Sequence, residues 1–191
     1  VDKISLPQNK KLFEKGKNIH AVASYFIKKF DVSKLENALT TEEKDIWKYL
    51  KNTKYFGYEF INSEYQISFK LDDNWFGGRL DALVENKEDY YILDYKTGAI
   101  PKNPEFDFQT MIYLLAVDRL LNRKYKSLNF VYLDLKNKDE KIINFSDDFK
   151  QKYEENLKKV AEKIEISQSF QKISNQGNKC NCDYYKFCKI L

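Results

Sequence analysis

Long apolar runs, arginine and histidine are all scarce in this 191-residue chain. No stretch approaches the roughly 18 consecutive apolar residues that a membrane-spanning helix needs. The N-terminal segment also lacks the apolar centre of a secretory signal, and the chain shows no internal repeat and no low-complexity segment. These absences argue against a membrane protein, a secreted protein and a repeat architecture. We therefore expect a cytoplasmic protein that makes no membrane contact.

Arginine occurs only at Arg79, Arg119 and Arg123, so nearly all of the positive charge comes from lysine. A net charge of +4 and a pI near 8.7 are compatible with nucleic-acid binding but weaker than in a dedicated binder. A hydrophobic content of 42% with 16% aromatic residues argues against disorder. We expect one domain over residues 1–191. Because the chain begins with Val1, it is open whether it is a piece of a longer protein.

Two strand-like segments, Phe76 to Val84 and Tyr90 to Tyr95, carry conspicuous acidic residues on either side of a polar turn. Because side chains alternate along a strand, Asp94 and Lys96 project from one face, about 6.6 Å apart. If the two segments pair as a hairpin, Asp81 comes to lie beside Asp94. The alternation also predicts two faces for the first segment: Arg79, Asp81 and Leu83 on one, and Leu80, Ala82 and Val84 on the core-facing side.

Converging carboxylates repel one another unless a cation lies between them, and hard oxygen ligands suit Mg²⁺ or Mn²⁺. Such an ion activates water and neutralises charge on a phosphate. Lys96 can then position the water or stabilise charge on the phosphoryl oxygens. This chemistry fits hydrolysis of a phosphodiester. Alone, the Asp-x-Lys tripeptide is equally compatible with an exposed ion pair of little energetic value.

The segments GRLD at 78–81 and LDYKTG at 93–98 resemble the RecB-like branch of the PD-(D/E)xK nuclease superfamily. The resemblance implies an Mg²⁺-dependent deoxyribonuclease, and an exonuclease of DNA repair, recombination or defence in particular. DNA is the implied substrate, and a helicase, either bound or fused, is the implied partner. A second interpretation is a nucleic-acid-binding module of a helicase–nuclease complex with little catalysis of its own.

Apolar residues recur at helical spacing from Lys10 to Phe30, and His20 falls on this stripe one turn after Gly16. Glycine there lets the helix approach another backbone closely. A lone histidine on an apolar face is usually a hydrogen-bonded core residue. Gly-x-x-x-His, however, is similar to the opening motif of the RecB-like nucleases. The resemblance implies a metal site formed by His20, Asp81, Asp94 and the Tyr95 carbonyl.

The segment from Glu64 to Leu71 alternates polar and apolar residues, which predicts the first strand of the sheet. In the family an acidic residue often begins this strand and assists the site, whereas a solvated strand-end carboxylate is the other interpretation of Glu64. Gln109 and Tyr113 lie one turn apart on a helix predicted over Glu105 to Leu121. This pair resembles the family's Gln-x-x-x-Tyr motif, which supports the lysine and contacts the DNA backbone. From the residues alone, the tyrosine belongs to the core and the glutamine to the surface.

The remaining elements complete the prediction of the fold. A helix is expected over Thr41 to Leu50 with Thr41 as its N-cap, and a last helix runs from about residue 149 to residue 164. Strands are expected at Leu128 to Leu135 and Ile142 to Phe145. This order predicts an α/β domain with a mixed sheet flanked by helices, the restriction-endonuclease-like core.

All three cysteines, Cys180, Cys182 and Cys188, lie in the C-terminal tail, residues 178–191. Their clustering favours metal binding over disulfides, and sulfur ligands suit an iron–sulfur cluster or zinc. The tail resembles the cysteine cluster of iron–sulfur nucleases in this superfamily, which implies a 4Fe–4S cluster in the full-length protein. The Cys-x-Cys spacing and the lack of a cysteine before the first helix depart from that pattern.

Overall fold

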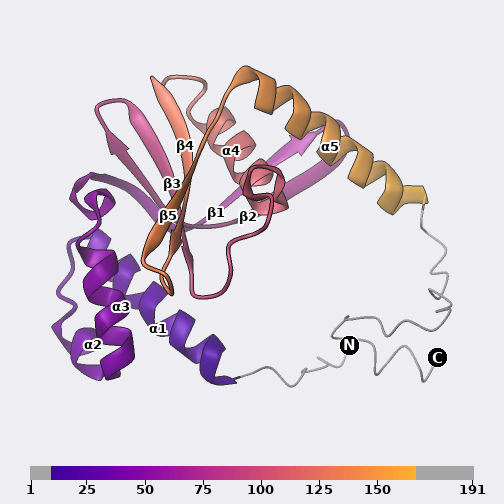
Figure 1. The fold of residues 1–191 in the computed structure, drawn as a ribbon. Coiled ribbons are helices and arrows are strands. Elements are labelled where there is room, and N and C mark those ends of the chain that lie inside the picture. Colours follow the sequence, from indigo (N-terminus) through magenta and orange to yellow (C-terminus); the bar gives the residue numbers. More distant parts are fainter. Residues whose placement is uncertain (1–9, 167–191) are drawn as a thin grey trace, which may run out of the picture.

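A five-stranded mixed sheet separates two helical layers in the computed structural model, which describes residues 10–166 (Figure 1). The strand order β1-β2-β3-β4-β5 is antiparallel except between β3 and β4, which run parallel. The predicted mixed α/β sheet with flanking helices is therefore confirmed. The strands are β1 Glu59–Leu71, β2 Asn74–Asn86, β3 Asp89–Lys96, β4 Ser127–Asp134 and β5 Asp139–Asn144.

Helices cover both faces of this sheet (Figure 1). On one face lie α1 Lys10–Ile27, α2 Ser33–Ala38, α3 Thr41–Lys51 and the 3₁₀ turn η1 Lys54–Gly57. On the other lie α4 Phe108–Leu120, which follows the 3₁₀ turn η2 Pro104–Phe106, and α5 Asp147–Ile166. Among residues 10–166, no helix combines the length and the apolar character needed to cross a bilayer.

Each face of the sheet packs a hydrophobic core of its own. Ile19, Ala23 and Leu50 pack against Ala82, Val84, Leu93 and Val131 on the α1 face. Leu114, Val117, Tyr153 and Leu157 pack against Leu80, Leu83, Ile92 and Phe130 on the α4 face. Because β3 and β4 are covered on both sides, their sequences are nearly continuous apolar runs.

Several predicted boundaries need correction. The N-cap of α3 is Thr40 rather than Thr41, because the Thr40 hydroxyl accepts a hydrogen bond from the Glu43 N–H while the Glu43 carboxylate accepts one from the Thr40 N–H. Strand β1 begins at Glu59 instead of Glu64. Helix α4 begins at Phe108, where the Asp107 carboxylate accepts a hydrogen bond from the Gln109 N–H. The short helix α2 was not predicted.

The predicted common face for Leu80, Ala82 and Val84 is wrong. Leu80 packs in the α4 core, whereas Ala82 and Val84 pack in the α1 core. Between the paired positions Ser63↔Ala82 and Tyr65↔Leu80, Glu64 has a φ of 50°, outside the range of a regular strand. The local twist at Glu64 accounts for the change of face.

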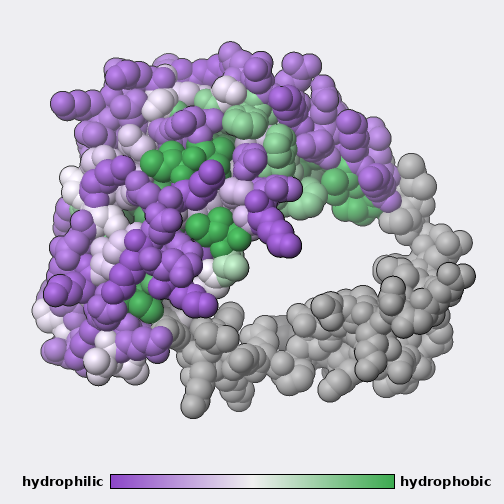
Figure 2. Space-filling model, in the orientation of Figure 1, coloured by the Kyte–Doolittle hydropathy of each residue, from purple (hydrophilic) through white to green (hydrophobic). Residues whose placement is uncertain are grey.

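The predicted cysteine site lies outside the described residues, since Cys180, Cys182 and Cys188 all follow residue 166. Within the described residues, hydrophilic side chains cover most of the face shown in Figure 2, and hydrophobic ones form a few separate patches.

Candidate active site

The site lies where strands β2 and β3 separate. Their pairing ends at Ala82↔Leu93, and in the same register Asp81 would lie next to Asp94. Instead of a further backbone pair, the Asp81 Oδ2 atom accepts a hydrogen bond from the Tyr95 N–H at 2.8 Å. The carboxylate therefore fills the fork between the strands, with its position fixed by the backbone of β3.

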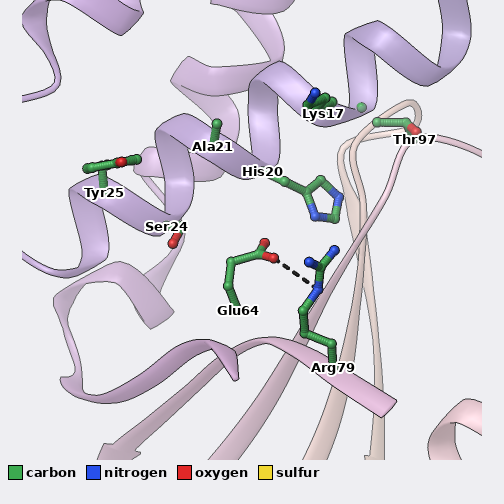
Figure 3. A pocket seen from close by; sticks show the side chains of 9 residues that line it. Lys17, His20, Ala21, Ser24, Tyr25, Glu64, Arg79 and Thr97 are labelled. Atoms are coloured by element: carbon green, nitrogen blue, oxygen red, sulfur yellow. Dashed lines mark ion pairs between the residues drawn. The ribbon is translucent and has the colours of Figure 1, made fainter. Parts of the chain in front are cut away.

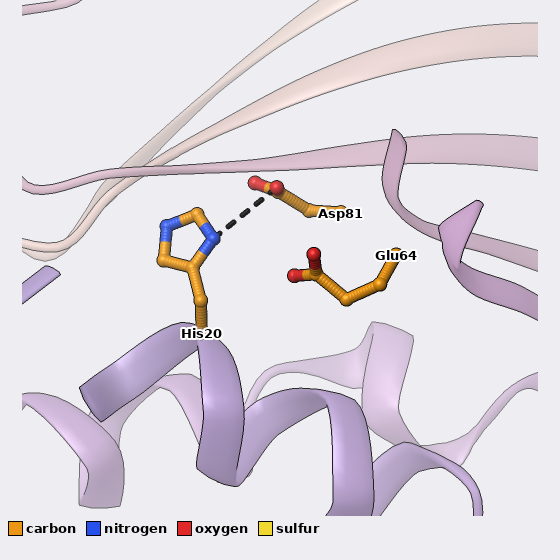
Figure 4. A group of neighbouring side chains, drawn as sticks. All are labelled: His20, Glu64 and Asp81. Carbon is orange, nitrogen blue, oxygen red and sulfur yellow. Dashed lines mark ion pairs between the residues drawn. The ribbon is translucent and has the colours of Figure 1, made fainter. Parts of the chain in front are cut away.

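Helix α1 brings His20 to this fork from one face of the sheet (Figure 4). Its Nδ1 atom lies 3.2 Å from Asp81 Oδ1, and its Nε2 atom lies 3.0 Å from the Tyr95 carbonyl oxygen. A Cβ atom on Gly16 would lie 3.3 Å from the Thr97 hydroxyl oxygen, so the glycine allows close packing of α1 on the loop after β3. The lack of a side chain there helps to set the distance between imidazole and carboxylate.

Two opposed effects act on the pKa of His20. Burial lowers the pKa of His20, but the hydrogen bond that the ring donates to Asp81 and the negative charge of Asp81 outweigh burial, so the pKa lies above the ordinary 6.5. Protonated, the ring can donate to both Asp81 and the Tyr95 carbonyl; unprotonated, it offers a nitrogen lone pair to a metal ion.

Glu64, from the twisted position in β1, completes a group with His20 and Asp81. One ligand atom from each residue lies within 4.8 Å of the other two, all three are partly buried, and all point into one space (Figure 4). Two carboxylates and an imidazole are a donor set that suits a divalent cation such as Mg²⁺ or Mn²⁺. The residues present therefore fit the metal that the sequence implied.

On the opposite face of β3, Asp94 forms a closed polar triangle with Lys96 and Gln109. Asp94 is only 4% exposed, and its Oδ2 atom lies 2.9 Å from the Lys96 ammonium. Gln109 links the two charges, because its amide N–H donates to Asp94 Oδ1 and its carbonyl oxygen accepts from Lys96 Nζ at 2.8 Å. Burial, followed by the charge of Asp81, raises the pKa of Asp94, while Lys96 and Gln109 oppose the rise.

The structure thus divides the predicted site between two faces of one strand. It brings His20 and Asp81 together, adds Glu64, and places Asp94 outside this group of three. Although Lys96 is close, the buried Asp94 Oδ2 accepts no well-directed hydrogen bond from the described residues. Metal ligation by Asp94 and by the Tyr95 carbonyl stays a prediction.

Tyr113 contacts a different group from the one expected. Its hydroxyl accepts a hydrogen bond from the Arg79 N–H at 3.1 Å and donates one to the Arg79 carbonyl at 2.8 Å. Because β3 has already separated from β2 at this point, the hydroxyl satisfies backbone groups that a neighbouring strand would otherwise pair. A Cβ atom on Gly78 would lie 2.5 Å from the Tyr113 ring, so glycine before Arg79 makes room for this contact. Of the pair expected to support Lys96, Gln109 accepts a hydrogen bond from its ammonium, whereas no hydrogen bond joins Tyr113 to Lys96 among the described residues.

Sequence reasoning assigned no role to Arg79, whose Nε atom lies 3.1 Å from Glu64 Oε2. Both residues line a cavity of about 500 Å³ beside the fork, whose other wall is a stripe of α1 that includes His20 and Ser24 (Figure 3). The scarcity of arginine could have pointed to Arg79, because the chain has only three arginines and one of them lies inside the GRLD segment.

The sequence of the chain matches that of a known protein family. Residues 34–189 match the PD-(D/E)XK nuclease superfamily. The chain belongs to this superfamily. Over 59 residues, 30% of the chain, it is 37% identical to a subunit of the ATP-dependent helicase/nuclease of Moorella thermoacetica. The predicted superfamily and its RecB-like branch are thereby confirmed.

The likeness to that curated relative is local, because the match covers only 4% of the relative's length. A broader likeness links the chain to the crystal structure of an exonuclease candidate from Eubacterium rectale. The TM-score is 0.53, and the match covers 97% of this chain and 76% of the other at 10% identity. At such low identity the likeness shows the fold alone, which is the predicted restriction-endonuclease-like α/β fold.

Proposed function

We propose that this nuclease-superfamily chain is a divalent-metal-dependent deoxyribonuclease that hydrolyses DNA from strand ends. One observation carries the proposal: Gln109 holds Lys96 against the buried Asp94 carboxylate on one face of β3, and the group formed by His20, Glu64 and Asp81 lies on the other, close enough for the charge of Asp81 to act on Asp94. A fixed ammonium next to a donor set for a hard cation is what metal-assisted phosphodiester hydrolysis requires.

The residues that would hold Mg²⁺ or Mn²⁺ are His20, Asp81, Asp94 and the Tyr95 carbonyl, with Glu64 assisting. When bound, the ion would supply Lewis-acid polarisation of the phosphate and a more acidic water. His20 ligates only in its unprotonated form, so it must release the proton that lets it donate to both Asp81 and the Tyr95 carbonyl. Asp81 is already oriented by the Tyr95 N–H and needs little rearrangement.

Lys96 and Gln109 supply the positive side of the site. The Lys96 side chain is about one-quarter exposed, so its ammonium can reach substrate while Asp94 and Gln109 fix its direction. There it would hold the attacking water or stabilise charge on the phosphoryl oxygens. Gln109 is itself fixed at the start of α4, where Asp107 accepts a hydrogen bond from its N–H.

The first test is DNA cleavage by variants in the presence of Mg²⁺ and Mn²⁺. We expect Asp94→Ala and Lys96→Ala each to abolish metal-dependent cleavage, and the nearly isosteric Asp94→Asn to do so with less disturbance of packing. Lys138→Ala is the matched control, because Lys138 also pairs with an aspartate, Asp45, but at the surface. Wild-type rates in the Asp94 or Lys96 variants would refute the assignment.

Two further measurements define the activity. Cleavage of linear DNA with circular DNA left intact supports an exonuclease, whereas linearisation of circles shows endonuclease activity. Calorimetric titration with Mn²⁺ separates a nuclease from a binding-only module, because only the nuclease needs metal affinity that depends on Asp81. A chain that binds DNA but shows no such affinity would favour the binding-only interpretation.

The likeness to part of a helicase/nuclease supports a proposal about context. We infer that the chain acts on DNA that a helicase presents, either fused to it or bound as a separate protein. The expected result is duplex cleavage that becomes ATP-dependent when the helicase is present. Equal duplex cleavage with and without helicase and ATP would contradict this inference.

A further inference from the structure

Beyond the fork, β1 and β2 continue as a two-stranded ribbon that has one exposed face. Phe69, Phe76 and Leu80 point toward the core under α4 and α5. Because side chains alternate, every second residue of the two strands points the other way, and those from Gln66 to Lys70 and from Trp75 to Arg79 are exposed in the structure. We call this surface the ribbon face; it is formed by Gln66, Ser68, Lys70, Trp75, Gly77 and Arg79.

The ribbon face is hollowed next to the site. A trough of about 620 Å³ is lined by Gln66, Ser68 and Arg79 together with Ile67 and Gly78. Arg79 also lines the cavity of about 500 Å³ that contains His20 and Glu64. The trough and the site therefore share one wall, and a chain-like ligand held in one would pass Arg79 to reach the other.

The position and exposure of Arg79 suit it to binding an anion. Its backbone is fixed by the Tyr113 hydroxyl, while its side chain is 66% exposed. The Nε atom pairs with Glu64, and among the described residues neither Nη atom has a hydrogen bond or ion pair. A guanidinium with free terminal N–H groups matches the two oxygens of a phosphate.

The other two arginines are already committed to the fold. Arg119 pairs with Glu154 and stacks over the Phe69 ring, and Arg123 pairs with Asp147. In the trough, no side-chain hydrogen bond within residues 10–166 engages Gln66 or Ser68, so an amide and a hydroxyl lie free beside the Arg79 guanidinium. Neutral donors of this kind and an arginine are side chains that commonly bind the phosphate oxygens of a nucleic acid.

Trp75 lies farther along the same face, about 13 Å from Arg79 at 3.3 Å per residue. It is 70% exposed, the highest exposure among the large hydrophobic residues of the described part. Its register partner Lys70 lies opposite on β1. The nearby Asp73 and Asp72 pair with Lys70 and Lys158, which reduces their repulsion of a polyanion. An exposed indole on a polar strip is a stacking platform for an unpaired base.

We propose that a DNA strand entering the site lies along the ribbon face, with one phosphate on Arg79 in the trough and an unpaired base stacked on Trp75. This inference rests on the proposed function, because the strand it describes is the substrate of that site. The contacts need no metal ion and no cleavage, so they are measurable separately from catalysis.

Tryptophan fluorescence gives a direct readout. The chain has two tryptophans; Trp47 is 4% exposed and Trp75 is 70% exposed. Titration of the full chain with oligothymidylate in EDTA should quench the Trp75 emission saturably. Trp75→Phe should lose this quenching, whereas Trp47→Phe should keep it. Inorganic polyphosphate serves as the second probe, since it offers phosphates without bases.

Affinity measured with a dye-labelled oligothymidylate tests each contact. Trp75→Ala should weaken binding by about 5- to 150-fold, the loss expected for one stacked base. Arg79→Gln should weaken binding and lower the slope of log affinity against log salt by about 0.7, the value for one phosphate on a single strand. Arg123→Gln is the matched control and should leave both quantities unchanged.

The outcomes separate the two proposals. Bound oligothymidylate that does not quench Trp75, equal quenching by polyphosphate, or an Arg79→Gln variant that behaves as Arg123→Gln would overturn the ribbon-face proposal. If quenching and salt dependence follow expectation but no metal supports cleavage, the proposed nuclease activity fails and the ribbon face stands. A metal-dependent nuclease whose Trp75 and Arg79 variants bind normally would show the reverse.

Discussion

The two faces of β3 solve the problem of buried charge in opposite ways. On the α4 face, Asp94 has its own cation, because Lys96 and Gln109 close a triangle around it. On the α1 face, the carboxylates of Glu64 and Asp81 lie close to one imidazole, and Arg79, which pairs with Glu64 alone among the described residues, is two-thirds exposed. The comparison teaches that the α4 face is internally balanced, whereas the α1 face gains most from an added cation.

The largest effect on stability should come from removing the cation that pairs with Asp94 on the α4 face. Lys96→Ala leaves the Asp94 carboxylate buried without its cation, which should lower the free energy of unfolding by about 3 kcal/mol or more. The double variant Asp94→Asn with Lys96→Met removes both charges and should recover most of this loss. Urea unfolding measures both.

The matched control is Lys138→Ala, which breaks a surface pair with Asp45 and should cost about 1 kcal/mol at most. Equal losses for Lys96→Ala and Lys138→Ala would show that the triangle contributes no more than a surface pair.

Next in size is the response of the α1 face to metal. Mn²⁺ at about one hundred times its dissociation constant should raise the free energy of unfolding by about 2.7 kcal/mol. Asp81→Asn removes a charged ligand and should abolish most of this gain, whereas Asp139→Asn, at an exposed position of β5, should keep it. Thermal unfolding with Mn²⁺ and with EDTA measures the difference, and a full gain in Asp81→Asn would contradict the proposed metal site.

A smaller effect is expected where the sheet splits. Tyr113→Phe removes the hydroxyl that satisfies the Arg79 N–H and carbonyl, at a cost of about 1–3 kcal/mol. Tyr49→Phe loses a single exposed hydrogen bond to the Asp139 carbonyl and should cost well under 1 kcal/mol. If the two variants unfold at the same urea concentration, the hydroxyl of Tyr113 is not needed to hold the fork.

The smallest effect on stability should come from the Glu64–Arg79 pair. Arg79 is two-thirds exposed, so Glu64→Gln should change the free energy of unfolding by about 1 kcal/mol at most. The same variant should nevertheless reduce the Mn²⁺-dependent stabilisation, since it removes one of three potential ligands. Unchanged metal stabilisation would limit the group to His20 and Asp81.

The sequence predicted correctly which side chains share a face of a strand where polar and apolar residues alternate clearly. Asp94 and Lys96 lie on the face opposite Leu93 and Tyr95, as strand alternation predicts. The same rule failed for Leu80 and Ala82, because both faces of the sheet are buried and apolarity no longer indicates a side. Glu64 has a left-handed φ, and the side chains change faces at this position. The sequence could not indicate this, since glutamate rarely adopts such a φ.

The sequence by itself determined which residues carry charge, which segments form strands and helices, and the order of motifs that identified the superfamily. Covalent geometry also sets the spacing of Asp94 and Lys96, since both belong to one strand. Only the tertiary structure decided that His20 meets Asp81, that Tyr113 holds Arg79 rather than Lys96, and that Asp94 stays outside the three-residue group. These contacts join elements far apart in the chain, and they depend on where β2 leaves β3, which is a balance of packing over the whole sheet.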